Sequence, residues 1–373
     1  MNTTMGVIFA NIYETSLGDL TNKRTMASLP YGGRYRQIDF SLSNMTNSGI
    51  RHIGIITKHN YQSLMNHVGS GQEWDLNLEE GGLEYLTPFA QGHNGFWRGK
   101  LEALNDAIDF FTLAKEDYVV LSDSAVLCAV DLNEVVENHI ASGADVTVMV
   151  KDGISNGVKQ LDMAVKANED GKVTDIAVDY CADKSYLACM GIFVMRRDYL
   201  IQRVTEAVAR SYYHFERDLV MYAFAKLGAK VNAYRFQGVA LFNESTAEFF
   251  QNSLKLLDPE VRHGLFNRSN RTIYTTVRNE VPSYYGVDSQ IDDCIVADGC
   301  TLEGCAERSV LFRGVTLGKD AKVKESIIMQ DCIIGEGAEL ECVILDKDVV
   351  IGPGKRLCGT KEYPLVIKRG EIV

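Results

Sequence analysis

Residues 20–50 read Leu20-Thr-Asn-Lys-Arg-Thr-Met-Ala-Ser-Leu-Pro-Tyr-Gly-Gly-Arg-Tyr-Arg-Gln-Ile-Asp-Phe-Ser-Leu-Ser-Asn-Met-Thr-Asn-Ser-Gly-Ile50. A short apolar run, Val7–Ala10, precedes this stretch and is typical of a buried strand. The stretch itself supplies a loop, then a predicted helix over Ile38–Ile50 that leads to a second strand at Ile53–Thr57. This order is that of the opening unit of a nucleotide-binding α/β domain. The loop carries two glycines and four cations that suit an oxyanion or a phosphate group: Lys23, Arg24, Arg34 and Arg36.

Apolar strands and amphipathic helices continue to alternate up to about residue 257, which predicts a mainly parallel sheet covered by helices on both faces. One long helix is expected over Arg98–Lys115 because its apolar residues follow a helical period. A further helix, Thr246–Leu257, is expected to close this domain. The other strands are predicted at Tyr118–Ser122, Asp145–Val150, Ala164–Ala167, Gly191–Met195 and Val231–Arg235.

The pattern changes after a mixed segment, residues 258–285, which is interpreted as a linker. Leu317-Gly318, Ile334-Gly335 and Ile351-Gly352 follow one another 17 residues apart. A repeat of aliphatic residues with glycine at the corners predicts a left-handed parallel β-helix over residues 286–373, with one coil of three strands per repeat. About four coils are expected, so the exposed strand edges at its ends need another domain or subunit to cover them.

Composition excludes several classes of partner. The formal net charge of −12 argues against nucleic acid and anionic membranes as partners. No apolar run reaches the roughly 18 residues that a membrane span needs, and no secretory signal is expected. Nine cysteines without CxxC spacing indicate reduced thiols and a cytoplasmic protein. Seven histidines form no metal-binding pair, so no zinc site is predicted.

Pro30–Asn44 and the following Asn47-Ser-Gly-Ile50 resemble the start of ADP-glucose pyrophosphorylase, also called glucose-1-phosphate adenylyltransferase. The resemblance extends over nearly the whole chain. It implies a Rossmann-like nucleotidyltransferase domain over residues 1–257, followed by the left-handed β-helix. It is strongest to the non-catalytic subunit type that accompanies the catalytic subunit in some bacterial glycogen pathways.

The family's triphosphate loop is the first element that this chain lacks. Such a loop needs glycines because backbone N–H groups must approach the phosphates closely. The aligned stretch, Ala10-Asn-Ile-Tyr-Glu-Thr-Ser-Leu17, contains no glycine and places Glu14 where phosphates would lie. The family's next phosphate-facing lysine and proline are replaced by Met26 and Ala27.

The two carboxylates that hold Mg²⁺ in the family are also missing. Nucleotidyl transfer depends on a metal ion that bridges the phosphates. The aligned positions are Ser124 and Phe242. Asp123 and Glu244 are adjacent, and whether either restores weak metal binding stays open. The family's sugar-phosphate lysine motif is likewise absent from Ala177-Val-Asp-Tyr-Cys181.

Two sets of residues are retained. Lys23, Arg24, Arg34 and Arg36 are predicted to bind a phosphorylated effector or a phosphate, because the resemblance implies an effector site near this loop; the alternative is a solvated or interface charge network. A residual substrate pocket is predicted at Trp97, Gly99 and Asp218, although Trp97 also suits simple packing. Just after Gly99, Lys100 and Glu102 stand where the family has Thr and Asp.

The resemblance and these departures predict a regulatory, catalytically inactive subunit. It would hold no cofactor firmly, with Mg²⁺ bound in the catalytic partner, and would form a homo-oligomer alone and a heterotetramer with the catalytic subunit. An active glucose-1-phosphate adenylyltransferase and a non-enzymatic sensor of sugar phosphates or nucleotides are the alternatives. Acyl transfer on the β-helix is disfavoured because no histidine follows His263.

Overall fold

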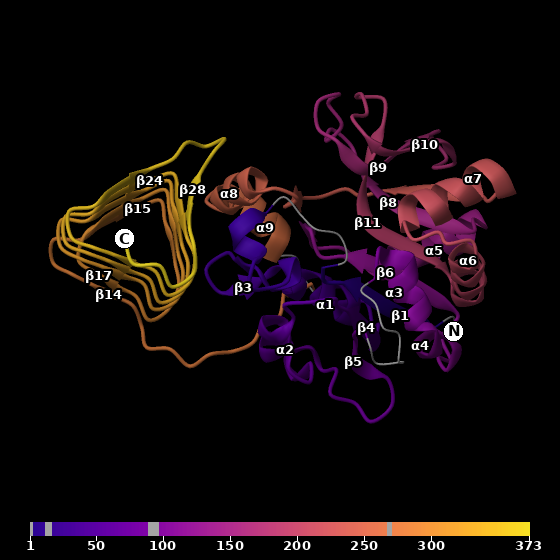
Figure 1. Cartoon of the computed structure of the whole chain (residues 1–373), viewed down its shortest axis with the longest axis horizontal. Coiled ribbons are helices and arrows are strands. Elements are labelled where there is room, and N and C mark those ends of the chain that lie inside the picture. The colour runs from indigo at the N-terminus through magenta and orange to yellow at the C-terminus, as the bar shows by residue number, and fades with distance from the viewer. Residues whose placement is uncertain (1–2, 12–16, 89–96, 267–270) are drawn as a thin grey trace.

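The computed structural model describes residues 3–11, 17–88, 97–266 and 271–373. An α/β domain and a β-helix lie side by side, with helices α8 (Thr246–Lys255) and α9 (Pro259–Phe266) between them (Figure 1). No helix in these ranges is long and apolar enough to cross a membrane.

The α/β domain is built on a nine-stranded sheet in the order β10-β9-β11-β6-β1-β4-β5, with β8 and β12 joined beside β11. Strand β1 is parallel to both β4 and β6, whereas β11 is antiparallel to β6, β8 and β9. All seven predicted strands are confirmed, although the sheet is mixed. Its strands are β1 (Thr4–Phe9), β4 (His52–Ile56), β5 (Gly82–Leu86), β6 (Tyr118–Asp123), β8 (Val146–Lys151), β9 (Leu161–Ala167), β10 (Val173–Tyr180), β11 (Leu187–Arg196) and β12 (Val231–Arg235).

Helices cover both faces of the sheet and complete two apolar cores. One face is covered by α3 (Lys100–Asp106), α4 (Ile108–Thr112), α6 (Arg197–Ala209), the π-helix η4 (Phe215–Met221) and α7 (Tyr222–Leu227). The other is covered by α1 (Gln37–Asn47), α2 (Gln62–Val68) and α5 (Leu132–Ser142). The smaller elements are the 3₁₀ turns η1 (Gly18–Thr21), η2 (Met26–Ser28) and η3 (Gln72–Trp74) and the strand pairs β2 (Pro30–Tyr31) with β3 (Tyr35–Arg36) and β7 (Val126–Cys128) with β13 (Ala240–Phe242).

The prediction of one unbroken helix over residues 98–115 is wrong. It is broken at Ala107, which ends α3 and precedes α4. Asn105 and Asp106, both weak helix formers, occupy the turn before the break. Leu113, which the helical period would place on the apolar face, is 81% exposed. The second segment therefore does not continue the apolar face of the first as far as Leu113.

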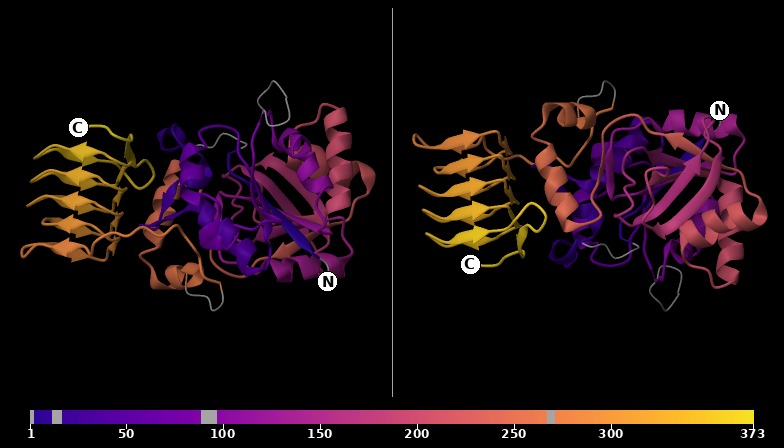
Figure 2. Two further views of the ribbon diagram at one scale, coloured as in Figure 1. Left: turned by 90° about the horizontal axis from the view of Figure 1, so that it is seen from below. Right: turned by 90° about the horizontal axis from the view of Figure 1, so that it is seen from above.

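The β-helix has three flat faces of five stacked parallel strands each, so five coils are present where about four were expected (Figure 2). Leu317, Ile334 and Ile351 stack in register, as the 17-residue repeat predicts. The faces are formed by β14 (Tyr284–Tyr285), β17 (Thr301–Leu302), β20 (Thr316–Leu317), β23 (Ile333–Ile334) and β26 (Val350–Ile351); by β15 (Gln290–Asp292), β18 (Cys305–Glu307), β21 (Lys322–Lys324), β24 (Glu339–Glu341) and β27 (Arg356–Cys358); and by β16 (Ile295–Val296), β19 (Val310–Leu311), β22 (Ile327–Ile328), β25 (Val343–Leu345) and β28 (Leu365–Ile367).

A shared apolar core joins the two domains. It includes Tyr31 and Phe40 from the loop and α1, and Phe312, Met329 and Ile344 from the β-helix. Helices α8 and α9 contribute to the same core, so the segment predicted as a linker begins with a packed helix. The boundaries at residues 257 and 286 stay predictions.

Candidate functional site

A cavity of about 470 Å³ in the α/β domain lies where β1 and β6 end. These two strands are parallel, and the carboxyl ends of parallel strands are where α/β sheets bind ligands. The walls come from β9, β11 and the first turns of α3 and α8. Seven charged side chains line it among the described residues: Lys100, Asp123, Lys159, Asp162, Glu216, Glu244 and Glu248.

Lys100, the first residue of α3, lies between two carboxylates on one side of the cavity. Its Nζ is 2.7 Å from Asp123 Oδ2 and 2.5 Å from Glu216 Oε1. The Lys100 and Glu216 side chains are only 3% exposed. Gly191 gives Asp123 its space, because a Cβ there would lie 2.6 Å from Oδ2. Lys100 therefore acts as a buried counter-ion to both acids.

Burial and charge act in opposite directions on these two acids. Burial raises the pKa of Asp123, and the nearby Glu216 raises it further, against the opposing charge of Lys100. Burial alone would also raise the pKa of Glu216, but Lys100 outweighs it and the pKa is lowered. The charge of Lys100 thus favours the ionised form of Glu216, against the effect of burial.

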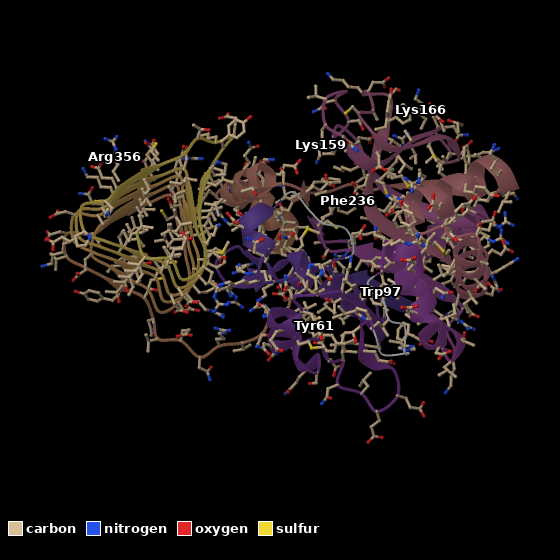
Figure 3. The ribbon with its side chains drawn as sticks, viewed as in Figure 1. Tyr61, Trp97, Lys159, Lys166, Phe236 and Arg356 are labelled. Atoms are coloured by element: carbon tan, nitrogen blue, oxygen red, sulfur yellow. The ribbon has the colours of Figure 1, made fainter. Side chains whose placement is uncertain are left out.

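Lys159, which also lines the cavity, is paired with two carboxylates in the same way. Its Nζ is 2.8 Å from Glu244 Oε2 and 2.5 Å from Glu248 Oε1, and 5.5 Å from the centre of the Phe242 ring. Burial alone would lower the pKa of Lys159, but the two carboxylates outweigh it and raise the pKa. In Figure 3, Lys159 lies on the side of the β9–β10 arm that faces α8.

The cavity is consequently acidic and its cations are already paired. Five carboxylates face two ammonium groups among the described residues that line it. A triphosphate entering here would meet net negative charge, which repels it. No group of three or more metal-ligating side chains is found within the described part of the chain.

The residues expected to replace the family's metal ligands do not fit a metal. Ser124 is buried and donates its hydroxyl to the Phe9 carbonyl. Phe242 is buried in an apolar core. Asp123 and Glu244 do reach the cavity, but each is paired with a lysine. Of the loop predicted to replace the triphosphate loop, residues 12–16, including Glu14, lie outside the described residues.

None of the three predicted residual pocket residues is among the described residues that line this cavity, and Asp218 lines a separate small pocket. Trp97 is packed in a core, beside α3 in Figure 3, and donates its indole N–H to Asp106 at 2.5 Å. The Tyr213 carbonyl approaches Gly99 so closely that a Cβ there would lie 2.3 Å from it. Asp218 accepts hydrogen bonds from the backbone N–H groups of Tyr213 and His214.

These contacts give the three residues a supporting role. Gly99 and Asp218 hold the Tyr213–His214 segment against the start of α3, where Leu101 N–H donates to the Tyr213 carbonyl. This segment precedes Glu216, and Gly99 precedes Lys100. The sequence marked the substitution at Lys100, but it gave no sign that Glu216 lies opposite.

A second candidate site is the basic cluster between the domains, which contains three of the four predicted loop cations and four residues from the linker and β-helix. Arg24 is buried and paired with Asp346. Arg36 donates to the carbonyl and hydroxyl of Ser63, and its pKa is lowered to about 10 by burial and nearby cations. Lys23 is exposed. The cluster, defined by mutual electrostatic effects, consists of Arg24, Arg34, Arg36, Arg278, Arg313, Lys347 and Arg369.

Lys347 is affected by both burial and the neighbouring cations. Its pKa is lowered from 10.5 to about 7, mainly by burial and then by Arg36 and Arg24. The charge of Arg278 lowers the pKa of both Arg36 and Arg313, so these two arginines belong to one cluster. Four of these seven cations come from the linker and β-helix, and no local signal in the sequence indicated that they would meet the loop.

A family described as "Nucleotidyl transferase" matches residues 5–237, and one described as "GlmU-like, C-terminal hexapeptide" matches residues 281–362. The chain belongs to the nucleotidyl transferase family. Within it, the chain is 33% identical over 369 residues to "Glycogen biosynthesis protein GlgD" of Bacillus subtilis (strain 168), covering 99% of this chain and 96% of the relative.

Further nucleotidyl transferase relatives carry two kinds of name. The protein of Geobacillus stearothermophilus that is also named "Glycogen biosynthesis protein GlgD" is 36% identical, over 100% of this chain and 97% of the relative. A "Glucose-1-phosphate adenylyltransferase" of Pseudothermotoga lettingae is 30% identical, over 87% of this chain and 77% of the relative. The predicted resemblance and fold class are thereby confirmed.

Proposed function

We propose that this chain is a regulatory, catalytically inactive subunit of glucose-1-phosphate adenylyltransferase that supports ADP-glucose synthesis for glycogen biosynthesis. The names of its full-length relatives support the pathway. The observation that carries the proposal is the pairing of both cavity lysines with carboxylates. A cavity whose lysines are already paired with its own carboxylates suits a chain that keeps the scaffold and has lost the reaction.

The chemistry of the reaction requires groups that this cavity lacks. Transfer of a nucleotidyl group needs charge stabilisation on the phosphates, which a metal ion and cationic side chains supply. Here Ser124 and Phe242 offer no carboxylate, and Lys100 and Lys159 are already paired. We therefore assign no firmly held cofactor to this chain and place the Mg²⁺ in the catalytic partner.

Assembly is the second part of the proposal. Strand β14 forms the first coil's edge, and Tyr284, Tyr285 and the following Val287 are 56%, 51% and 100% exposed. Exposed apolar residues on an open strand edge favour association with another chain. The chain would form a homo-oligomer alone and a heterotetramer with the catalytic subunit, in the cytoplasm, where its nine cysteines, none of them in a disulfide, would stay reduced.

A phosphorylated effector is proposed for the basic cluster. Guanidinium groups bind phosphates through their fork of donors. Arg36, Arg278 and Lys347 come from the loop, the linker and the β-helix and influence one another electrostatically, so their combined charge would attract an anion to the junction of these three segments. Binding there would change how the two domains meet, which gives the effector a route to the partner subunit.

The deciding experiment measures pyrophosphate release from ATP and glucose 1-phosphate by this chain alone, by a catalytic subunit alone, and by the mixture. We expect the chain alone to be about a thousandfold or more slower than the catalytic subunit, because metal-based stabilisation is missing. We expect the mixture to differ from the catalytic subunit alone in activity or effector response. Comparable turnover by the chain alone would favour the active enzyme, and ligand binding without any effect on a partner would favour the sensor.

A further inference from the structure

We propose that Lys100 is the resident cation of the cavity and that its ammonium group excludes a divalent metal ion from the space between Asp123 and Glu216. The proposal concerns the ionic state of the cavity. It stands whether or not the chain regulates a partner subunit, because it rests on contacts within this chain alone.

The geometry supports a fixed ammonium position. Lys100 Nζ contacts an oxygen of each acid, at 2.7 Å for Asp123 and 2.5 Å for Glu216. The Lys100 side chain is 3% exposed and its Nζ also lies 5.2 Å from the centre of the Phe9 ring. Its backbone starts α3, where the Tyr213 carbonyl packs on the preceding Gly99. The position of the ammonium group is therefore fixed by the two carboxylates and by the packed backbone at the start of α3.

A metal ion and this ammonium cannot occupy the cavity wall together. Hard divalent cations bind carboxylate oxygens at about 2.0–2.6 Å. An ion that bridged the two oxygens that Lys100 Nζ contacts would overlap Nζ. A divalent ion displaced by a few ångströms would still be repelled by the ammonium in a partly desolvated site.

The chemistry of the acids explains why one cation is required here. Two carboxylates share this region with the further acid Asp162, whose pKa is raised mainly by burial. His214 Nδ1 lies 3.3 Å from the other oxygen of Glu216. Removing Lys100 would leave buried negative charge without its counter-ion, which is strongly destabilising. An external divalent cation would then relieve the repulsion and bind, although only weakly, because two carboxylates form an incomplete site.

The test uses the full-length chain and Mn²⁺ alone as the probe, with bound Mn²⁺ measured by electron paramagnetic resonance and thermal unfolding measured with and without the ion. The wild-type chain is expected to bind no Mn²⁺ in the cavity, and its unfolding temperature should not change. Lys100→Met should unfold at lower temperature, regain part of that loss with Mn²⁺, and bind Mn²⁺ at least about tenfold more tightly than any residual binding elsewhere on the wild type.

The matched control is the double variant Lys100→Met with Glu216→Gln, which removes one of the two carboxylates and should lose the gained Mn²⁺ binding. If Lys100→Met does not fold, Lys100→Gln keeps a donor to both acids without the charge and serves instead. The proposal is overturned if the wild type binds Mn²⁺ as tightly as the Lys100 variant. It is equally overturned if a folded Lys100 variant gains no Mn²⁺ binding, or if the double variant retains it.

Discussion

Arg24 in the first domain and Asp346 in the β-helix form a buried ion pair across the domain interface. One guanidinium nitrogen donates to both carboxylate oxygens, at 2.6 and 2.9 Å, and each side chain is 3% exposed. Arg24 also contacts the Met329 sulfur. The residue expected to bind an anion from solvent therefore already has an internal anion. Its part in the basic cluster is to join the two domains.

Replacing Asp346 with Asn should destabilise the protein by about 3–5 kcal/mol, because it leaves Arg24 buried without a counter-charge. Urea unfolding of the full-length chain measures the loss. Asp348→Asn is the matched control. Asp348 lies two positions after Asp346 and also pairs with an arginine, Arg369, but its side chain is 45% exposed. The control should lose about 1 kcal/mol or less. Equal losses in the two variants would contradict the role given to the buried pair.

Sulfate binding at the basic cluster should strengthen as the pH falls through about 7. Lys347 has its pKa lowered to about 7, so in the folded chain it gains its charge only below that pH. Between pH 7 and its ordinary value, the unfolded chain holds this proton and the folded chain does not. The contribution of Lys347 to stability therefore rises with pH across that window and is least below it. An anion that binds charged Lys347 offsets the free-energy cost of burying its ammonium group.

Sulfate is the right probe because its own charge is constant over this pH range. Affinity measured by calorimetry should fall toward higher pH by up to about tenfold per unit above the pKa. Lys347→Arg should remove this dependence, because arginine stays charged, and Lys347→Met should weaken binding at low pH. His67, whose pKa is lowered mainly by burial, stays neutral in this window. A wild-type affinity independent of pH would refute Lys347 as a ligand.

Gly99→Ala should destabilise the first domain by about 1–3 kcal/mol, as overpacking does. The added methyl group would press on the Tyr213 carbonyl, which accepts a hydrogen bond from Leu101. Arg98→Ala, next to it and 56% exposed, is the control and should change stability by less than about 1 kcal/mol. Thermal unfolding distinguishes this supporting role from the predicted role in a substrate pocket, which would leave stability unchanged.

Deleting residues 287–373 should abolish assembly and leave the first domain poorly soluble. The deletion removes Phe312, Met329 and Ile344, and so uncovers the apolar surface around Tyr31 and Phe40. Sedimentation velocity, alone and with the catalytic subunit, measures the outcome. A truncated chain that stays monodisperse and still joins the catalytic subunit would show that the β-helix is dispensable for assembly.

Local patterns were sufficient to predict most of the fold. Helix α1 and strands β1 and β4 follow from periodicity in residues 7–57, and the β-helix follows from its repeat. The break at Ala107 was missed because an apolar period continues through it while the backbone does not. Periodicity reports which side chains are apolar and gives little information about where a helix axis changes direction.

The sites were harder to predict because their contacts are distant in sequence. Lys100 was noted as a substitution, but its partner Glu216 lies 116 positions later. Arg24 was placed among anion ligands, and its partner Asp346 lies 322 positions later. Without knowledge of these carboxylates, a cation in a glycine-containing loop indicates an anion from solvent. The structure supplies the internal anions.

The apolar core shared by Tyr31 and Phe40 with Phe312, Met329 and Ile344 sets a condition on synthesis. A ribosome releases the first domain long before it releases the coils that cover this surface, since domains emerge in chain order. Until the third and fourth coils have been translated, aromatic side chains near the N-terminus lack their final partners. The apolar surface around Tyr31 and Phe40 therefore stays uncovered, and open to aggregation, until the chain as far as Ile344 has left the ribosome.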